Sequence, residues 1–231
     1  MTKSFVHLTA TNRGGAGIAA ERMHANLSMA GHRSRMIVND CDPQADGIFP
    51  TETLLSNIRS GVSKTYFRLA ARQRFYFRNQ DLHNPNLQTV IDLAVQARPD
   101  AIICHSITSF LSFADVARIH HATGAPVIWY LMDMASFTGG CHYAWDCYRY
   151  RSGCGFCPAL RLPHGRDFSF RTLDHKVATL KEIRSVAVAG STWLADQARS
   201  SALFQDSEID VIPLAVSPDD FGPRNQRALR L

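Results

Sequence analysis

The sequence has no stretch that would cross a membrane or direct the chain to secretion. Its first twelve residues, MTKSFVHLTATN, lack the charged start and long apolar core of a signal peptide. No window approaches the roughly 20 apolar residues that a membrane-spanning helix needs. We therefore expect a cytoplasmic protein.

The composition indicates an ordinary folded chain with an excess of positive charge. Its 231 residues, 45% of them hydrophobic, are enough to bury a full core in one large domain. The formal net charge of +5 favours anionic partners, such as nucleotide phosphates, lipid headgroups or nucleic acid. The net charge alone does not choose between these partners.

Short apolar runs alternate with helical patterns along most of the chain. Consecutive apolar strands separated by helices predict an α/β fold with a parallel sheet covered on both faces. Cys41–Ser60 is polar and turn-rich and is predicted to be a loop. The predicted strands are Phe5–Ala10, Arg33–Asn39, Ala101–His105, Pro126–Leu131, Val186–Gly190 and Asp210–Ala215, and the helices after the first include Asn86–Ala97, Phe110–Thr123, Arg171–Ser185 and Thr192–Ser201.

A glycine-rich turn follows the first predicted strand. Gly14, Gly15 and Gly17 precede a helical pattern, and glycines there let the backbone approach a phosphate at the helix N-terminus. The spacing is not the GxGxxG fingerprint, so a plain strand-to-helix turn is an equally good interpretation. We treat the three glycines as candidate phosphate-binding residues.

Phe137–Pro158 carries four of the six cysteines, spaced C-x5-C-x6-C-x2-C. Cys141, Cys147, Cys154 and Cys157 would complete a tetrahedral zinc site with four sulfur ligands. Two local disulfides and a fully reduced set remain open, and the lack of a secretory signal favours zinc. Cys41 and Cys104 are expected to take no part.

Val62–Arg78 reads as a basic amphipathic helix. Its basic face also holds Phe67 and Phe75, a combination that suits shallow docking on an anionic membrane. A solvated helix face with two aromatics under a neighbouring loop is the alternative. Nucleic-acid binding is not expected, because no recognised nucleic-acid module surrounds these residues. The cations of this face are Lys64, Arg68, Arg72, Arg74 and Arg78.

The cysteine-rich segment also resembles a known family. Leu131–Pro158, LMDMASFTGGCHYAWDCYRYRSGCGFCP, is similar to a segment of bacterial glycosyltransferases of colanic-acid and related exopolysaccharide synthesis. GGAGIAAERMH (Gly14–His24), AGSTWLADQARSSALF (Ala189–Phe204) and VIPLAVSPDDFGP (Val211–Pro223) are similar to further segments. Members are retaining, metal-independent, family 4-like enzymes with the two-domain GT-B fold. The resemblance covers residues 14–223 in patches, which correspond to the N-terminal, acceptor-binding domain.

The resemblance implies a Rossmann-like domain at residues 1–223, with the cysteine-rich loop 137–158 inserted and a truncated hinge or tail at 224–231. The family transfers sugar from a nucleotide-sugar to a glycan or lipid-linked acceptor in cell-surface polysaccharide synthesis, without a catalytic metal. Its donor domain carries an E-x7-E segment that has no counterpart here. We therefore expect the isolated chain to be inactive unless a donor domain acts in trans.

In open α/β sheets ligands bind beyond the carboxyl ends of the strands, and Gly14–Gly17, His105, Asp133 and Ser191 would all lie at such ends. The resemblance adds roles for single residues. Asp133 would orient an acceptor or sugar hydroxyl, while Gly14–Gly17 would line the donor diphosphate. His105, His142 and Ser191 are polar candidates in the same cleft, although each histidine is equally read as an ordinary loop residue. Two departures put the activity in doubt: the family's His-Asp is Met132-Asp133 here, and its hinge Asn-Gly is Leu214-Ala215.

Two other classes of function remain open. A glycosyltransferase-derived domain could serve only in interactions, or a zinc-stabilised basic module could bind nucleic acid. The membrane-docking helix, if present, would place a glycosyltransferase at the inner face of the cell membrane beside a lipid-linked acceptor.

Overall fold

The computed structural model describes residues 1–41, 46–53, 65, 69–72, 81–214 and 216. Most of Val62–Arg78 lies outside these residues, so the predicted membrane-docking helix stays a prediction. In the part of the chain that is described, no helix is both long and apolar enough to span a bilayer.

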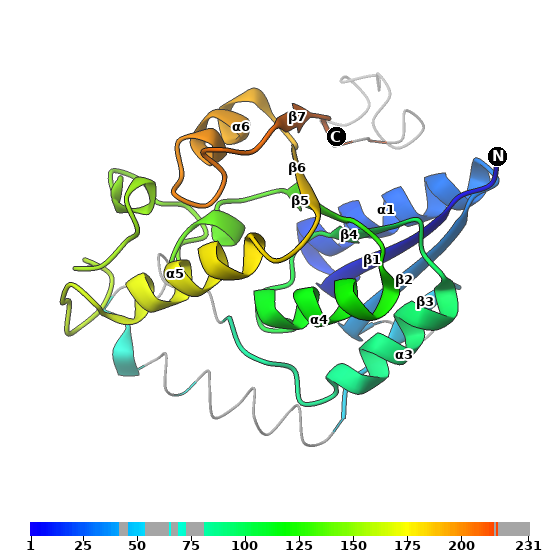
Figure 1. The fold of residues 1–231 in the computed structure, drawn as a ribbon, viewed down its shortest axis with the longest axis horizontal. Helices are drawn as coiled ribbons and strands as arrows, with labels where there is room; N and C mark the ends of the chain where they lie inside the picture. Colours follow the sequence, from blue (N-terminus) through cyan, green and yellow to red (C-terminus); the bar gives the residue numbers. More distant parts are fainter. Residues whose placement is uncertain (42–45, 54–64, 66–68, 73–80, 215, 217–231) are drawn as a thin grey trace, which may run out of the picture.

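A parallel sheet of seven strands forms the centre of the fold (Figure 1). Its order, β3-β2-β1-β4-β5-β6-β7, contains the doubly wound order of Rossmann-like folds with one strand added at the end. The α/β, Rossmann-like class predicted from the sequence is therefore confirmed. The strands are β1 Ser4–Thr11, β2 Arg33–Asp40, β3 Ile48–Pro50, β4 Ala101–Cys104, β5 Val127–Leu131, β6 Ser185–Ala189 and β7 Ile209–Val211.

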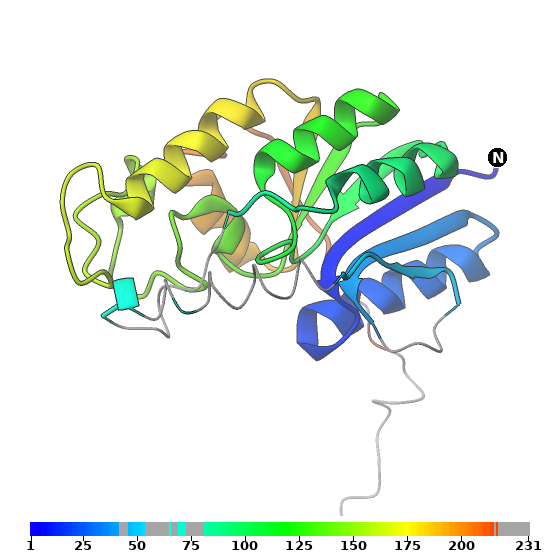
Figure 2. The same ribbon diagram turned by 90° about the horizontal axis from the view of Figure 1, so that it is seen from below.

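Helices cover both faces of this sheet, as predicted. α1 lies on one face, whereas α3, α4 and α5 lie side by side on the other (Figure 2). Because crossovers between parallel strands are right-handed, the direction in which the chain crosses the sheet sets the face on which the connecting helix lies. The chain moves in one direction from β1 to β2 and in the opposite direction from β4 to β7, so the two sets of helices lie on opposite faces. The helices are α1 Gly14–Met29, α3 Leu87–Ala97, α4 Phe113–Thr123, α5 Phe168–Leu180 and α6 Thr192–Arg199.

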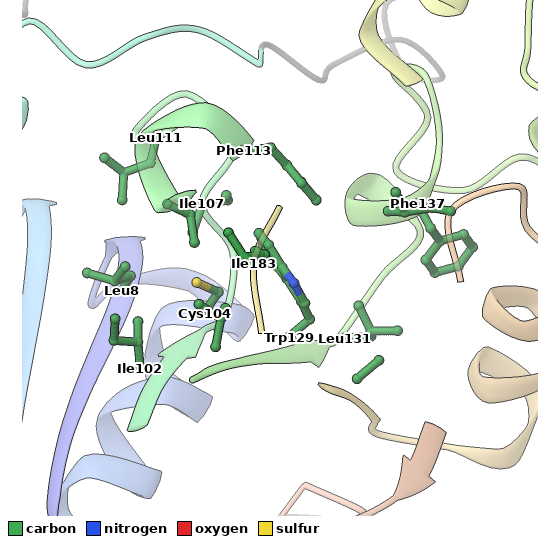
Figure 3. Packing of buried hydrophobic residues seen from close by; sticks show 14 of the residues in the cluster. Leu8, Ile102, Cys104, Ile107, Leu111, Phe113, Trp129, Leu131, Phe137 and Ile183 are labelled. Atoms are coloured by element: carbon green, nitrogen blue, oxygen red, sulfur yellow. The ribbon is translucent and has the colours of Figure 1, made fainter. Parts of the chain in front are cut away.

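The main core lies between the sheet and α3, α4 and α5. Figure 3 shows part of it, with side chains from β1, β4, β5 and the start of α4. Trp129 of β5 stacks on Phe113 of α4, with ring centroids 4.2 Å apart and planes 10° from parallel. Because alternate residues of a strand point to opposite faces, Tyr130 belongs instead to a smaller cluster against which Met23 of α1 packs. Both faces of the central strands are thus buried, which explains their continuous apolar runs.

Capping side chains determine where two helices begin. Ser112 and Asp115 form a capping box, so α4 begins at Phe113 and not at the predicted Phe110. Asp167 accepts hydrogen bonds from the backbone N–H groups of Ser169 and Phe170. α5 therefore begins at Phe168, before the predicted Arg171, and ends at Leu180.

Two other expectations about local structure need correction. Residues 48–50, inside the predicted loop, form β3, which pairs with Met36–Val38 of β2. The last strand ends at Val211, and residues 212–214, which were predicted to continue it, are not part of the strand. Pro213 follows closely, and because proline has no backbone N–H it cannot continue a ladder of strand hydrogen bonds.

Candidate functional site

The carboxyl ends of β1, β4, β5 and β6 lie at one edge of the sheet, because all the strands are parallel. Ligands of open α/β sheets bind beyond this edge. The sequence-predicted residues follow these ends in turn: Gly14–Gly17 after β1, His105 after β4, Asp133 after β5 and Ser191 after β6. The fold therefore gathers these candidates at one edge, as expected.

The three glycines of the first turn have different structural surroundings. A Cβ on Gly17 would lie 2.4 Å from the backbone oxygen of Thr11, so only glycine lets α1 pack this closely on β1. Gly14 has a φ of +69°, a conformation that glycine adopts without strain. Gly14 and Gly15 are exposed at the helix start, and a Cβ on either would meet nothing within 4 Å. Gly17 is thus structural, while the other two are open to a ligand.

Asp133 and His142 form a pair at the end of β5. The Oδ2 of Asp133 lies 2.9 Å from Nδ1 of His142, and its Oδ1 accepts a 2.7 Å hydrogen bond from the backbone N–H of Ala135. The backbone N–H of Met134 donates to the carbonyl of His142, which folds the cysteine-rich segment back onto the end of β5. His142 thereby supplies an imidazole beside the carboxylate, although the residue before Asp133 is a methionine.

His105 is not an open cleft residue. It is buried, and its Nε2 lies 2.9 Å from Nδ1 of His7, whose Nε2 lies 3.0 Å from Oγ of Ser34. Burial lowers the pKa of His105 to about 3, and burial followed by the neighbouring His105 lowers the pKa of His7 well below its ordinary value. Both rings are therefore neutral at physiological pH. The pair joins β1 to the residue that follows β4, and His105 also lines a small cavity together with Asp133 and Lys176.

Ser191 serves the helix that follows it. Its Oγ accepts a 3.2 Å hydrogen bond from the backbone N–H of Leu194 and so caps α6. The exposed Ser191 lies at the predicted edge, but this hydroxyl is already used in the cap.

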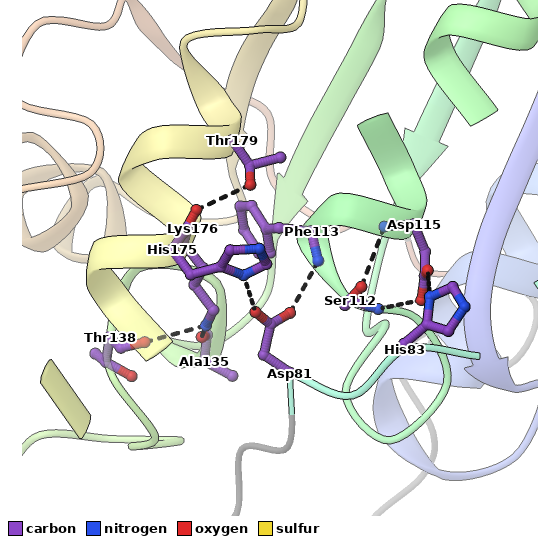
Figure 4. Close-up of polar contacts among 10 residues, drawn as sticks. All are labelled: Asp81, His83, Ser112, Phe113, Asp115, Ala135, Thr138, His175, Lys176 and Thr179. Atoms are coloured by element: carbon purple, nitrogen blue, oxygen red, sulfur yellow. Dashed lines mark hydrogen bonds and ion pairs between the residues drawn. The ribbon is translucent and has the colours of Figure 1, made fainter. Parts of the chain in front are cut away.

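Lys176 of α5 is a buried cation that the sequence analysis missed (Figure 4). Its Nζ donates hydrogen bonds to the backbone oxygens of Ala135, at 2.8 Å, and Thr138, at 3.1 Å. Burial lowers the pKa of Lys176 to about 8. Lys176 thus holds the segment that follows Asp133. The helical pattern of α5 carried no signal for this role, since a lysine there reads as a solvent-facing charge.

Asp81 connects α4 and α5 close to Lys176 (Figure 4). One carboxylate oxygen accepts a 2.8 Å hydrogen bond from the backbone N–H of Phe113, and the other lies 3.0 Å from Nδ1 of His175. The hydrogen bond to Asp81 raises the pKa of His175. Asp81, Asp133 and Lys176 line a cavity of about 20 Å³, enough for one water molecule.

The structure describes all six cysteines, and none of them forms a disulfide. Burial, followed by the neighbouring thiols, raises the pKa of Cys141 to about 12, and burial raises that of Cys154 to about 12. Within residues 1–41, 46–53, 65, 69–72, 81–214 and 216, no three His, Cys, Asp or Glu side chains are arranged to hold a metal ion. The donor types fit zinc, but the structure provides no ligand geometry for it, so the zinc site remains a prediction.

Two pockets adjoin this segment. The larger, about 590 Å³, is lined by residues of the cysteine-rich segment that include Cys141, Cys147 and Cys157. The other, about 330 Å³, lies beside the Asp133–His142 pair and is lined by Met134, Tyr143, Trp145, Tyr150, Trp193 and Gln197. The sequence patterns predict neither pocket. The signal that was available is the presence of Tyr143 and Trp193 within the segments that carry the family resemblance.

No family model and no curated protein matches this chain. Solved structures with partial similarity include WbmH of Bordetella bronchiseptica in complex with NAD+, at 10% identity and a TM-score of 0.42 over 81% of this chain and 55% of that one. WbmG of the same organism, in complex with NAD and UDP, is 12% identical, with a TM-score of 0.37 over 82% of this chain and 52% of that one. The glycosyltransferase VinC in complex with dTDP is 14% identical, with a TM-score of 0.35 over 80% of this chain and 49% of that one. The chain spans about half the length of each, and its family stays a proposal.

Proposed function

We propose that this chain is the acceptor-side domain of a glycosyltransferase that moves sugar from a nucleotide-sugar to a glycan or lipid-linked acceptor of the cell surface. The observation that carries the proposal is the Asp133–His142 pair, held at the carboxyl edge of the sheet beside a pocket lined by aromatic residues. The sequence resemblance to exopolysaccharide glycosyltransferases supports it independently.

The geometry of the pair suits the orientation of a hydroxyl group. Asp133 is fixed by the backbone N–H of Ala135 and by His142, and its carboxylate can accept a hydrogen bond from an acceptor or sugar hydroxyl. The imidazole of His142 is half-exposed and has its Nδ1 against this carboxylate, an arrangement that fixes the ring orientation. Asp133 and His142 together would align the attacking hydroxyl with the anomeric carbon.

The turn between β1 and α1 would take one side of the donor diphosphate. Gly14 and Gly15 are exposed at the start of a 16-residue helix, where unpaired backbone N–H groups and the helix dipole favour negative charge. The guanidinium of Arg13, beside them, is exposed and pairs with Asp40. Gly14 and Gly15 are therefore the donor-binding residues that we propose on this chain.

Transfer also needs the sugar nucleotide to be held from its other side. Fixed positioning of two reactants can supply roughly 7–11 kcal/mol of the barrier, and GT-B enzymes obtain it by closing two domains on each other. We propose that a donor domain with an E-x7-E segment fills this role, and that residues 1–231 alone have negligible turnover.

Reconstitution tests the proposal. The chain is combined with a donor domain from a related exopolysaccharide glycosyltransferase, and transfer from radiolabelled UDP- and GDP-sugars to a lipid-linked glycan fraction is measured. Asp133→Asn is expected to lower kcat at least 100-fold with sugar-nucleotide affinity unchanged. Asp146→Asn, which changes an exposed carboxylate of the same segment, is the matched control and is expected to retain activity.

Equal activity of Asp133→Asn and the wild type contradicts the assigned role. Robust transfer by the chain alone contradicts the requirement for a donor domain.

A further inference from the structure

The pocket of about 330 Å³ brings together residues from two distant parts of the sequence. Tyr143 and Trp145 come from the cysteine-rich segment, while Trp193 and Gln197 lie on α6. The pocket borders the Asp133–His142 pair, because Met134 and Tyr143, the next residues along the chain from each member, belong to its lining.

Three aromatic side chains of this lining are exposed to solvent. Trp145 is 61% exposed, Trp193 51% and Tyr143 38%. The rings of Tyr143 and Trp193 lie 6.0 Å apart and are tilted by 34°. Exposed indole and phenol faces gathered around a hollow mark a surface that buries them against a ligand.

Neighbouring side chains fix two aromatic residues of the lining, Tyr143 and Tyr150. The ring of Tyr143 makes an edge contact with that of His142, at 5.1 Å and 88°. The hydroxyl of Tyr150 donates a 2.6 Å hydrogen bond to Oε1 of Gln197, which ties the cysteine-rich segment to α6. Because these two contacts fix part of the lining before a ligand arrives, less conformational entropy is lost on binding.

The chemistry of the lining favours a neutral ring with one apolar face. None of its six residues carries a charge, so the phosphates of a nucleotide would find no cation there. Tyr150 uses the amide oxygen of Gln197, which leaves the amide NH2 as a donor, and Tyr143 adds a hydroxyl. A pyranose matches this set, because its C–H face packs on aromatic rings while its hydroxyl groups form hydrogen bonds at the rim.

We propose that this pocket is a subsite for a pyranose ring of the acceptor glycan, which packs on Trp193 and Tyr143 and presents a hydroxyl to Asp133 and His142. The assignment rests on the proposed function, because it identifies the ring as the acceptor of that reaction. The volume lies near the lower end of the roughly 300–1,000 Å³ of ligand pockets, so the subsite takes one or two sugar rings.

Binding of simple glycosides tests this subsite without any transfer reaction. Methyl pyranosides of glucose, galactose, mannose and fucose are titrated into the full chain, with tryptophan fluorescence and ligand-observed NMR as readouts. At least one pyranoside is expected to bind, whereas sorbitol, which has hydroxyl groups but no ring face, is expected not to bind. Equal binding of sorbitol, no binding of any pyranoside, or tighter binding of UMP at the same residues overturns the proposal.

Variants locate the binding in the pocket. Trp193→Ala is expected to weaken it at least tenfold, and Trp193→Phe, which keeps an aromatic face, to restore most of it. Phe156→Ala removes an equally exposed aromatic ring of the cysteine-rich segment that does not line this pocket, and is expected to change nothing. Unchanged binding by Trp193→Ala, with circular dichroism like that of the wild type, overturns the assignment.

The same variants separate this inference from the proposed function. In the reconstituted enzyme, an acceptor KM that is unchanged in Trp193→Ala overturns the subsite and leaves the glycosyltransferase proposal standing. Pyranoside binding that depends on Trp193, in a reconstituted enzyme that transfers no sugar, supports a pyranose site in this pocket but contradicts the proposed function and the acceptor role of the sugar.

Discussion

The ammonium group of Lys176 lies inside the protein and donates a 2.8 Å hydrogen bond to the backbone oxygen of Ala135 (Figure 4). A second hydrogen bond, to Thr138, makes this one side chain the link between α5 and the segment that follows β5. Asp133 precedes that segment and His142 follows it. The geometry of the proposed catalytic pair thus depends on a lysine that would not touch a substrate bound there.

Lys176→Met is therefore expected to destabilise the protein. The variant keeps the packing of the side-chain stem but leaves the part-buried carbonyl of Ala135 and the buried carbonyl of Thr138 without their donor, at a cost of about 2 kcal/mol in the free energy of unfolding. Urea denaturation at pH 7 measures the loss. Lys181→Met, at the exposed end of the same helix, is the control and is expected to stay within about 0.5 kcal/mol. Equal stability of the two variants would show that the buried hydrogen bonds contribute nothing.

Acid is expected to destabilise the protein through His7 and His105. Their folded pKa values are depressed, that of His105 to about 3, whereas the unfolded values are about 6.5. Below pH 6.5 the unfolded chain therefore binds protons that the folded chain does not. Stability is expected to fall by about 1.4 kcal/mol per pH unit for each of these two histidines.

Urea denaturation between pH 7.5 and 5 measures this slope. His105→Gln removes one titrating group and is expected to lower the slope of stability against pH by about 1.4 kcal/mol per pH unit, whatever its effect on stability at pH 7. His121→Gln, at an exposed position of α4, is expected to leave the slope unchanged. A slope that His105→Gln does not alter would contradict the assignment.

The cysteine-rich segment is expected to tolerate no side chain at position 139. A Cβ on Gly139 would lie 2.1 Å from the backbone oxygen of Ser169, close to the start of α5. Gly139→Ala must push the segment away from the helix and is expected to cost about 1–3 kcal/mol, the range for overpacking a buried site. Gly15→Ala, where a Cβ meets nothing within 4 Å, is the control. Thermal unfolding compares the two, and similar melting temperatures would show that the segment yields freely.

The zinc prediction is decided by elemental analysis of protein purified without a chelator. The sequence pattern predicts about one zinc ion per chain, and X-ray absorption should then show sulfur ligands at about 2.3 Å. Replacing Cys154 and Cys157 together with serine is expected to abolish binding, whereas Cys41→Ser is expected not to. Well under half an equivalent of zinc, with six titratable thiols, would contradict the zinc prediction and support the alternative in which all the cysteines are reduced, as they are in the structure.

Local sequence patterns were enough to predict the architecture. Apolar runs such as Ala101–Cys104 and Val127–Leu131, separated by helical patterns, indicate strands buried on both faces, and that requires a parallel sheet. Because parallel strands end at a common edge, the sequence also placed Gly14, Asp133 and Ser191 there. The bounds of the helices were inexact, since side-chain caps such as those of Ser112 and Asp167 determine where a helix begins. The short edge strand β3 was missed, because it lies within a polar, turn-rich stretch.

Only the tertiary structure decided what the candidate residues can do. His105 and His142 are both polar residues in loop-like sequence, yet one is buried against His7 and the other meets Asp133 at 2.9 Å. Trp193 faces Tyr143 across a pocket although the two belong to different segments. Periodicity reports only the face on which a residue lies within its own element. Burial, pairing and the shape of a pocket depend on segments that are distant in the sequence and become neighbours only when the chain folds.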